Sequence, residues 1–66
     1  MYWEDSYAIA LELIRQFPTV DLDKVSLGMI YQWTIALPGF RDDKQLVNDE
    51  ILKSIYQDWY EEVNPI

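Results

Sequence analysis

The chain has 66 residues and contains neither cysteine nor histidine, which limits the ways in which it can be stabilised. A chain this short buries only about 60% of the surface that its unfolded form exposes, and such chains often need disulfides or a structural metal. Disulfides, zinc sites, iron–sulphur ligation and haem ligation are excluded here. The fold must therefore be held by large apolar side chains, and half of the chain is hydrophobic, with three Trp, five Tyr and two Phe.

The charge balance is strongly acidic, with twelve acids against five bases and a net charge of −7. This balance disfavours a nucleic-acid partner, because DNA and RNA are themselves densely negative. It suits a basic protein surface or hard cations. No apolar run is long enough to span a membrane, and the first residues lack a basic region followed by an apolar core. We expect a soluble, cytoplasmic monomer with a single domain over residues 1–66.

The apolar pattern predicts three helices, over residues 6–17, 27–37 and 48–63. Between the first two, residues 19–25 should form a connector that contains at most a short extended piece or a single turn. Little or no sheet is expected. The predicted fold class is mainly α: a small three-helix domain of helix-turn-helix or modified winged-helix type.

The predicted helix ends follow from residues that favour them. Asp5 or Ser6 can accept hydrogen bonds from the N–H groups of the first turn, and Pro18 stops the first helix. Asn48 is a good N-cap for the third helix, and Asp49 and Glu50 in its first turn suit the positive end of the helix dipole.

The aromatic residues are expected mainly in the core. Trp33 and Trp59 lie on apolar helix faces, whereas Trp3 near the terminus should be only partly packed. Phe40 should be anchored in the core after a turn at residues 38–39. Tyr60 lies between the apolar and charged sides of the third helix and should be exposed to a partner.

The apolar face of the third helix is predicted to contain Ile51, Leu52, Ile55, Tyr56, Trp59 and Val63. The opposite side should carry a solvated stripe made of Glu50, Ser54, Asp58 and Glu61.

Two readings of these acids involve a metal. The segment "DDKQLVNDE" is a poor calcium loop, since Lys44, Leu46 and Val47 stand where oxygen ligands or Gly are required. On the third helix, Asp58 can pair with Glu61 or Glu62 one turn later and hold iron or manganese weakly, together with water. Glu50 lies about 12 Å away along the axis and cannot join this shell. The plain alternative is a solvated helix face without metal.

Catalysis is not expected. Carboxylate pairs can act as acid and base, but nothing in the sequence predicts a pocket that would shift their pKa values. The serines have no histidine to serve as a base. We therefore predict that the chain is not an enzyme.

The reading that accounts for most of the sequence is a docking surface. Acids are dense at 42–50 and again at 58–62, near the start and the end of the third helix, where one basic partner could contact both clusters. Such an interface would form fast and be sensitive to salt. The alternative is an acidic face that serves solubility only. The candidate partner-binding residues are Asp42, Asp43, Asp49, Glu50, Asp58, Glu61 and Glu62.

The whole chain resembles the IscX (YfhJ) family, small acidic proteins of bacterial iron–sulphur cluster assembly, without gaps. The matching residues are "WEDS" at 3–6, "IA" at 9–10, Leu13, Pro18, Asp21, Val25, "QW" at 32–33, Leu37, "FRDD" at 40–43, "NDEIL" at 48–52, Ile55, Trp59 and "EE" at 61–62. The resemblance implies a mostly helical, modified winged-helix fold. It also implies a non-enzymatic adaptor that binds the cysteine desulfurase, on a basic surface where bacterial frataxin binds too, and modulates sulphur delivery.

The resemblance further implies weak binding of Fe²⁺ by surface carboxylates, with no required cofactor. Acids of the family motif are matched at Asp42, Asp43, Glu50, Glu61 and Glu62. The chain departs from the family pattern at Lys44, where Pro is common, and at Ala8, Leu11 and Arg15, where acids are common. These departures leave fewer carboxylates for iron. The alternative functions are an iron donor or sensor and an unrelated helical interaction module.

Overall fold

The computed structural model describes residues 1–65 and has four elements in chain order: α1 (Ser6–Gln16), the 3₁₀ turn η1 (Leu22–Lys24), α2 (Leu27–Ile35) and α3 (Asp49–Val63). The described residues contain no strand. The three predicted helices and the mainly α fold class are therefore confirmed, and the connector forms the single turn η1. No helix in this part of the chain is long and apolar enough to cross a membrane.

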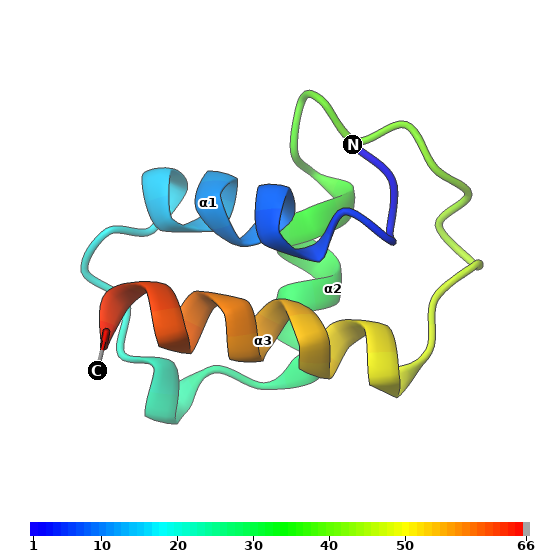
Figure 1. Ribbon diagram of the computed structural model, residues 1–66. Coiled ribbons are helices and arrows are strands. Elements are labelled where there is room, and N and C mark those ends of the chain that lie inside the picture. Colours follow the sequence, from blue (N-terminus) through cyan, green and yellow to red (C-terminus); the bar gives the residue numbers. More distant parts are fainter. Residues whose placement is uncertain (66) are drawn as a thin grey trace.

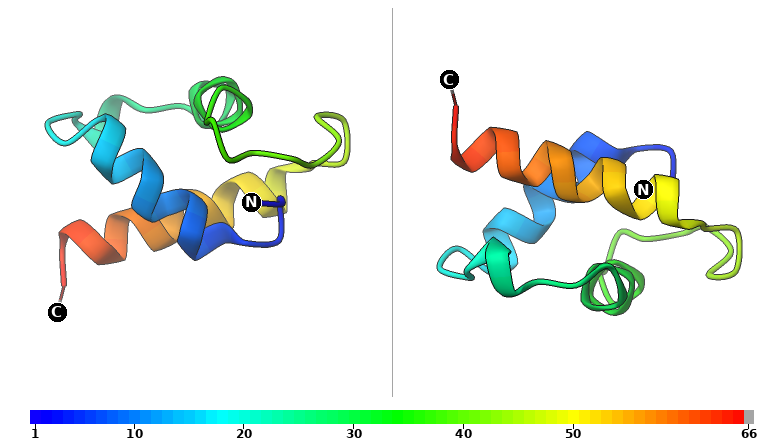
Figure 2. Two further views of the ribbon diagram at one scale, coloured as in Figure 1. Left: turned by 90° about the horizontal axis from the view of Figure 1, so that it is seen from above. Right: turned by 90° about the horizontal axis from the view of Figure 1, so that it is seen from below.

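The helices pack in two directions. α1 and α3 lie across the view of Figure 1, one above the other, and both begin on the side where the long α2–α3 loop runs. In both views of Figure 2, α2 is seen almost end-on, so it runs across the other two helices. The N-terminal segment lies beside the α2–α3 loop in Figure 1, which brings the first residues of the chain close to residues 39–43.

The helix termini follow the sequence signals in two of the three cases. Asn48 Oδ1 accepts a hydrogen bond from Ile51 N at 3.0 Å, so the predicted cap of α3 is confirmed. Ser26 Oγ accepts from Met29 N at 3.1 Å and caps α2. α2 ends at Ile35, two residues earlier than predicted, because the chain tightens into a turn in which Leu37 N donates to the Thr34 carbonyl.

The predicted cap of α1 is wrong. Asp5 occupies the N-cap position but makes no side-chain bond to the first turn, because its Oδ2 accepts from Tyr2 N at 3.0 Å instead. Ser6 Oγ donates to a carboxylate of α3 at 2.6 Å. The side chains of Asp5 and Ser6 thus bond to other parts of the chain and not to the backbone N–H groups in the first turn of α1.

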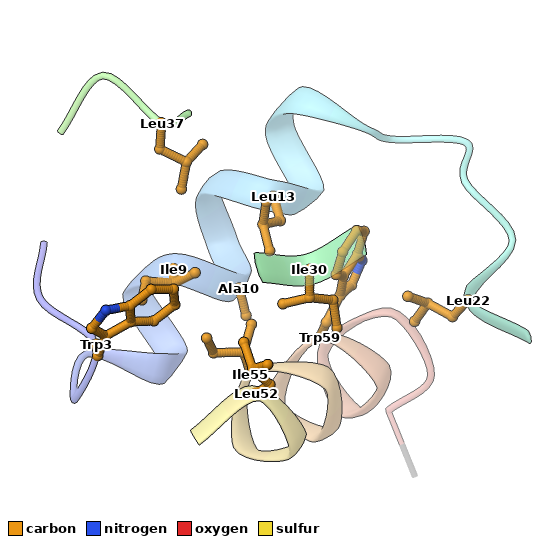
Figure 3. Packing of buried hydrophobic residues seen from close by; sticks show 10 residues of the cluster. All are labelled: Trp3, Ile9, Ala10, Leu13, Leu22, Ile30, Leu37, Leu52, Ile55 and Trp59. Carbon is orange, nitrogen blue, oxygen red and sulfur yellow. The ribbon is translucent and has the colours of Figure 1, made fainter. Parts of the chain in front are cut away.

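The core contains at least one side chain from each helix, from η1, from the N-terminal segment and from the α2–α3 loop (Figure 3). α1 and α3 each contribute residues spaced three or four apart, which places them on one face, and α2 contributes Ile30. The buried hydrophobic residues are Trp3, Ile9, Ala10, Leu13, Leu22, Ile30, Leu37, Leu52, Ile55 and Trp59.

The aromatic residues join the parts of the core, and Trp3 is the main correction to the sequence prediction. Trp3 is only 2% exposed, stacks on Tyr31 at 5.9 Å and meets Phe40 edge-on at 4.8 Å between ring centroids. Its burial is possible because the indole Nε1 donates to the Asp43 carbonyl at 2.8 Å, which satisfies its polar group. Trp59 is buried as predicted and Trp33 is half-buried between Phe17 and Trp59.

Two further residues differ from the helical pattern. Val63, predicted on the apolar face of α3, is 46% exposed because it lies in the last turn, beyond the end of the packed face. Thr34 is fully buried on α2, and its Oγ1 has no hydrogen-bond partner among the described residues.

Candidate acidic docking surface

The loop of residues 41–48, here called the acidic loop for Asp42 and Asp43 although it also carries Arg41 and Lys44, is held in place by the first residues of the chain. The Met1 amino group donates to the Gly39 carbonyl, and Arg41 N donates to the Met1 carbonyl at 2.9 Å. Trp3 then fills the space beneath the loop. These contacts join segments that are 38 to 40 residues apart in the sequence. The loop is therefore part of the tertiary structure although it contains no helix or strand.

Asp42 has a structural role as well as a charge. Its Oδ2 accepts a hydrogen bond from Trp3 N at 3.0 Å, and its Oδ1 accepts from Asp43 N at 2.8 Å. The side chain is half-buried. Because both carboxylate oxygens are already bonded to the backbone, Asp42 would act on a partner mainly through its negative charge, with few free lone pairs.

Asp43 lies next to it but is exposed. Its Oδ1 accepts from Gln45 N at 2.9 Å, the local bond of an Asx turn. No residue in 1–65 donates a hydrogen bond to the other carboxylate oxygen, Oδ2, so this oxygen is open to solvent. Asp43 thus combines a fixed backbone with an accessible charge.

Asp49 and Glu50 form the most accessible part of the candidate surface. Both are exposed in the first turn of α3, and neither side chain makes a hydrogen bond or ion pair with any residue in 1–65. The first acidic cluster predicted from the sequence thus contains three exposed acids, Asp43, Asp49 and Glu50, and one half-buried acid, Asp42.

The acids at the other end of α3 face more than one way. Asp58 is half-buried and accepts from Ser6 Oγ at 2.6 Å, while Glu62 Oε2 accepts from Tyr7 OH at 3.0 Å. Both therefore tie α3 to the start of α1. The prediction that Asp58 belongs to a solvated stripe is wrong, because α1 covers that flank of α3. Glu61, which accepts from Gln57 Nε2 at 3.1 Å, is exposed elsewhere on the helix.

This arrangement does not fit a defined iron site. Asp58 and Glu62 bond to neighbouring side chains at the start of α1, whereas Glu61 bonds to Gln57 elsewhere on α3. No group of three His, Cys, Asp or Glu side chains within residues 1–65 is close enough together to hold a metal ion. Weak binding of Fe²⁺ by two of these carboxylates stays a prediction.

The electrostatics of the surface are dominated by unpaired acids. In the described part of the chain one ion pair is present, between Arg15 Nη1 and Glu12 Oε1 at 3.0 Å on α1. The acids also affect Tyr7. The hydrogen bond to Glu62 and the negative charge of the same carboxylate raise the pKa of the Tyr7 phenol, and burial and the charge of Asp58 raise it further by smaller amounts.

A further hollow of the described residues does not contain the acidic loop. It is an open groove of about 1010 Å³ between the start of α2 and the outer side of α3, lined by Val25, Ser26, Leu27, Lys53, Tyr56, Gln57, Tyr60, Glu61 and Asn64. Sequence reasoning did not find it, and the only signal was Tyr60, which was correctly predicted to be exposed and is 47% exposed.

Comparison with known proteins identifies the family to which the chain belongs. The family model described as "Iron-sulphur cluster assembly" matches residues 1–64. The chain belongs to the IscX family. An uncharacterized protein of Pseudomonas aeruginosa is 35% identical over 60 residues, which cover 91% of each chain. The resemblance described from the sequence is thereby confirmed, and with it a role in iron–sulphur cluster assembly.

Removal of the Asp42 carboxylate should destabilise this IscX-family chain. We expect Asp42→Ala to lower the free energy of unfolding by about 1–3 kcal/mol, the usual range for hydrogen bonds to a charged group. Urea denaturation followed by circular dichroism measures this. The matched control is Asp43→Ala, which removes the same charge but only one exposed bond and should cost less than about 1 kcal/mol. Equal losses in the two variants would contradict the structural role of Asp42.

The Tyr7–Glu62 contact predicts a pH effect. Because the pKa of Tyr7 is raised in the folded state, its neutral form stabilises the fold at lower pH. This contribution is lost as pH rises from about 10, the ordinary tyrosine pKa, through the higher folded-state pKa.

Glu62→Gln should lower the folded-state pKa of Tyr7 toward its ordinary value, as followed by the ring signals of Tyr7 in NMR spectra across a pH titration. Glu61→Gln removes the same charge one residue earlier and should leave the Tyr7 titration unchanged. A Tyr7 titration that is the same in wild type and Glu62→Gln would show that the contact does not persist in solution.

Proposed function

We propose that this chain is a non-enzymatic adaptor of iron–sulphur cluster assembly that docks on a basic surface of a cysteine desulfurase and thereby modulates sulphur delivery. The docking surface consists of the acidic loop together with Asp49 and Glu50. The observation that carries this proposal is the lack of internal neutralisation: twelve acids share the surface, and Glu12 alone forms an ion pair within residues 1–65.

Unpaired exposed acids favour a basic partner for a physical reason. Their mutual repulsion costs free energy in the isolated protein, and a positive surface relieves it on binding. Complementary potentials also steer the two proteins together, so the association rate should be high at low salt and fall as salt is added. The desulfurase as the basic partner comes from the family resemblance, which also implies that frataxin uses the same surface.

The fixed geometry of the loop supports the same proposal. The acidic loop is tied to the N-terminal segment through Met1, Trp3 and Asp42, so its charges are held in one arrangement before the partner arrives. A preorganised surface loses less conformational entropy on binding than a mobile one. An adaptor that occupies a basic surface on the desulfurase can alter sulphur transfer by blocking or competing for that surface, without any chemistry of its own.

The alternative of an iron donor or sensor has less support. The carboxylates at the end of α3 that would serve as ligands are bonded to Ser6, Tyr7 and Gln57. Each of these bonds uses one carboxylate oxygen, so iron would share the carboxylates with bonds that already fix their orientation. No observation on the described residues favours a separate catalytic function either, because the carboxylates do not converge in a pocket.

The proposal is tested by titrating the chain into the cognate cysteine desulfurase in a calorimeter at low and high salt. We expect binding at low salt that weakens at high salt. Glu50→Lys should weaken it by roughly tenfold, because a charge reversal replaces an attraction with a repulsion of about 1 kcal/mol or more. Glu50 is the suitable position because its side chain is exposed and makes no hydrogen bond or ion pair within residues 1–65, whereas reversal at Asp42 would also release the N-terminal segment.

Asp23→Lys is the matched control, since it makes the same change in net charge at an exposed residue of η1, away from the acidic loop. It should reduce binding much less than Glu50→Lys. Absence of binding at low salt by the folded chain would refute the proposal, and equal weakening by both variants would refute the assigned surface.

A further inference from the structure

A second surface of the molecule has features of a peptide-binding site that the acidic docking surface does not use. Five residues of α3 and its C-cap Asn64 line the open groove, and each lies three or four positions from another: Lys53, Tyr56, Gln57, Tyr60, Glu61 and Asn64. This spacing makes one continuous helical stripe. It extends over about 16 Å at 1.5 Å per residue. The opposite wall is the short segment Val25–Leu27 that leads into α2.

The floor of the groove is apolar and well fixed. Tyr56 is half-buried, and its hydroxyl donates to the Leu22 carbonyl at 3.0 Å, which ties the floor to η1. Val25 and Leu27 pack against the core from the other side. Tyr60 stands beside them with 47% of its surface exposed and no side-chain hydrogen bond to any residue in the described range. An exposed aromatic beside a fixed apolar floor is the composition of a binding hot spot.

The groove does not end at Tyr60. Tyr60 and Asn64 also line a second, smaller hollow of about 310 Å³, whose other residues include Asp21 and Asp23 of the η1 turn. Lys53 lies at the opposite end of the groove, two helical turns before Tyr60. The surface thus has a cation, Lys53, at one end and a middle with Tyr56 and Tyr60, while its acids, Glu61 and then Asp21 and Asp23, lie toward the other end.

We propose that this groove binds a short peptide segment of a partner protein, with an acidic residue at one end, bulky apolar residues in the middle and Lys or Arg at the other end. An extended chain rises about 3.3 Å per residue, so about five residues match the length of the stripe. The order of charges on the groove places the acidic residue of the segment at Lys53 and its basic residue at Asp21 and Asp23. The site is separate from the acidic loop, so the chain can contact two partners at once.

The shape and charge of the surface favour this occupant over two others. A groove that continues along a helix into a second hollow fits a chain segment better than a compact small molecule. A second copy of this chain is disfavoured, because it would bring two molecules with a net charge of −7 together.

The probe for the test is a capped peptide with the sequence Asp-Leu-Phe-Leu-Arg, added to ¹⁵N-labelled protein while the backbone NMR spectrum is recorded. We expect concentration-dependent shifts at amides that line the groove. Tyr60→Ala should weaken binding roughly fivefold or more. Asp23→Lys should weaken it about threefold, the usual effect of losing an exposed ion pair. Glu50→Lys, with the same change in charge outside the groove, should leave the affinity unchanged.

A control peptide, Asp-Leu-Phe-Leu-Glu, should bind more weakly than the probe, because its last side chain faces Asp21 and Asp23. Three results would overturn the proposal: no shifts with the probe, shifts spread over the acidic loop and lost equally in Glu50→Lys, or groove shifts produced by concentrating the protein alone. The outcome is independent of desulfurase binding, since Asp23→Lys should impair only the peptide and Glu50→Lys only the desulfurase.

Discussion

The rest of the structure depends on the position of Trp3. Its ring fills the space beneath the acidic loop and packs against Tyr31 and Phe40, while its two N–H groups reach Asp42 and the Asp43 carbonyl. In a chain that has no disulfide and a small core, burial of one large aromatic is a substantial share of the stability. The same residue therefore closes the hydrophobic core and fixes the arrangement of the charges above it.

The acids of the chain divide by what they contact. Asp42 holds the N-terminal segment, and Asp58 and Glu62 hold the start of α1. Asp43, Asp49 and Glu50 are exposed, and these supply the accessible charge of the candidate docking surface. Carboxylates bonded within the fold keep their charge and still add to the long-range field. Asp and Glu side chains can serve in a weak iron site, in a docking surface or in contacts between helices. Only the contacts that each carboxylate makes distinguish these roles.

The sequence predicted local features well and long-range ones poorly. Helix periodicity and the Asn48 cap depend on residues a few positions apart, and both were confirmed. The burial of Trp3 depends on partners 39 and 40 residues away, which no local pattern reveals. Asp58 was misplaced because a helical wheel does not show which flank a neighbouring helix covers. The groove beside Tyr60 was missed because its second wall comes from the start of α2.

The most direct test of this account is hydrogen exchange of the Trp3 indole N–H and backbone N–H in the native protein. If the loop and the N-terminal segment belong to the cooperative fold, both protons should exchange as slowly as the amides of Leu13 and Ile55 in the core. Exchange of both Trp3 protons at the rate of an unstructured peptide would contradict it. The acidic loop would then be mobile, and its charges would not form a fixed surface for a partner.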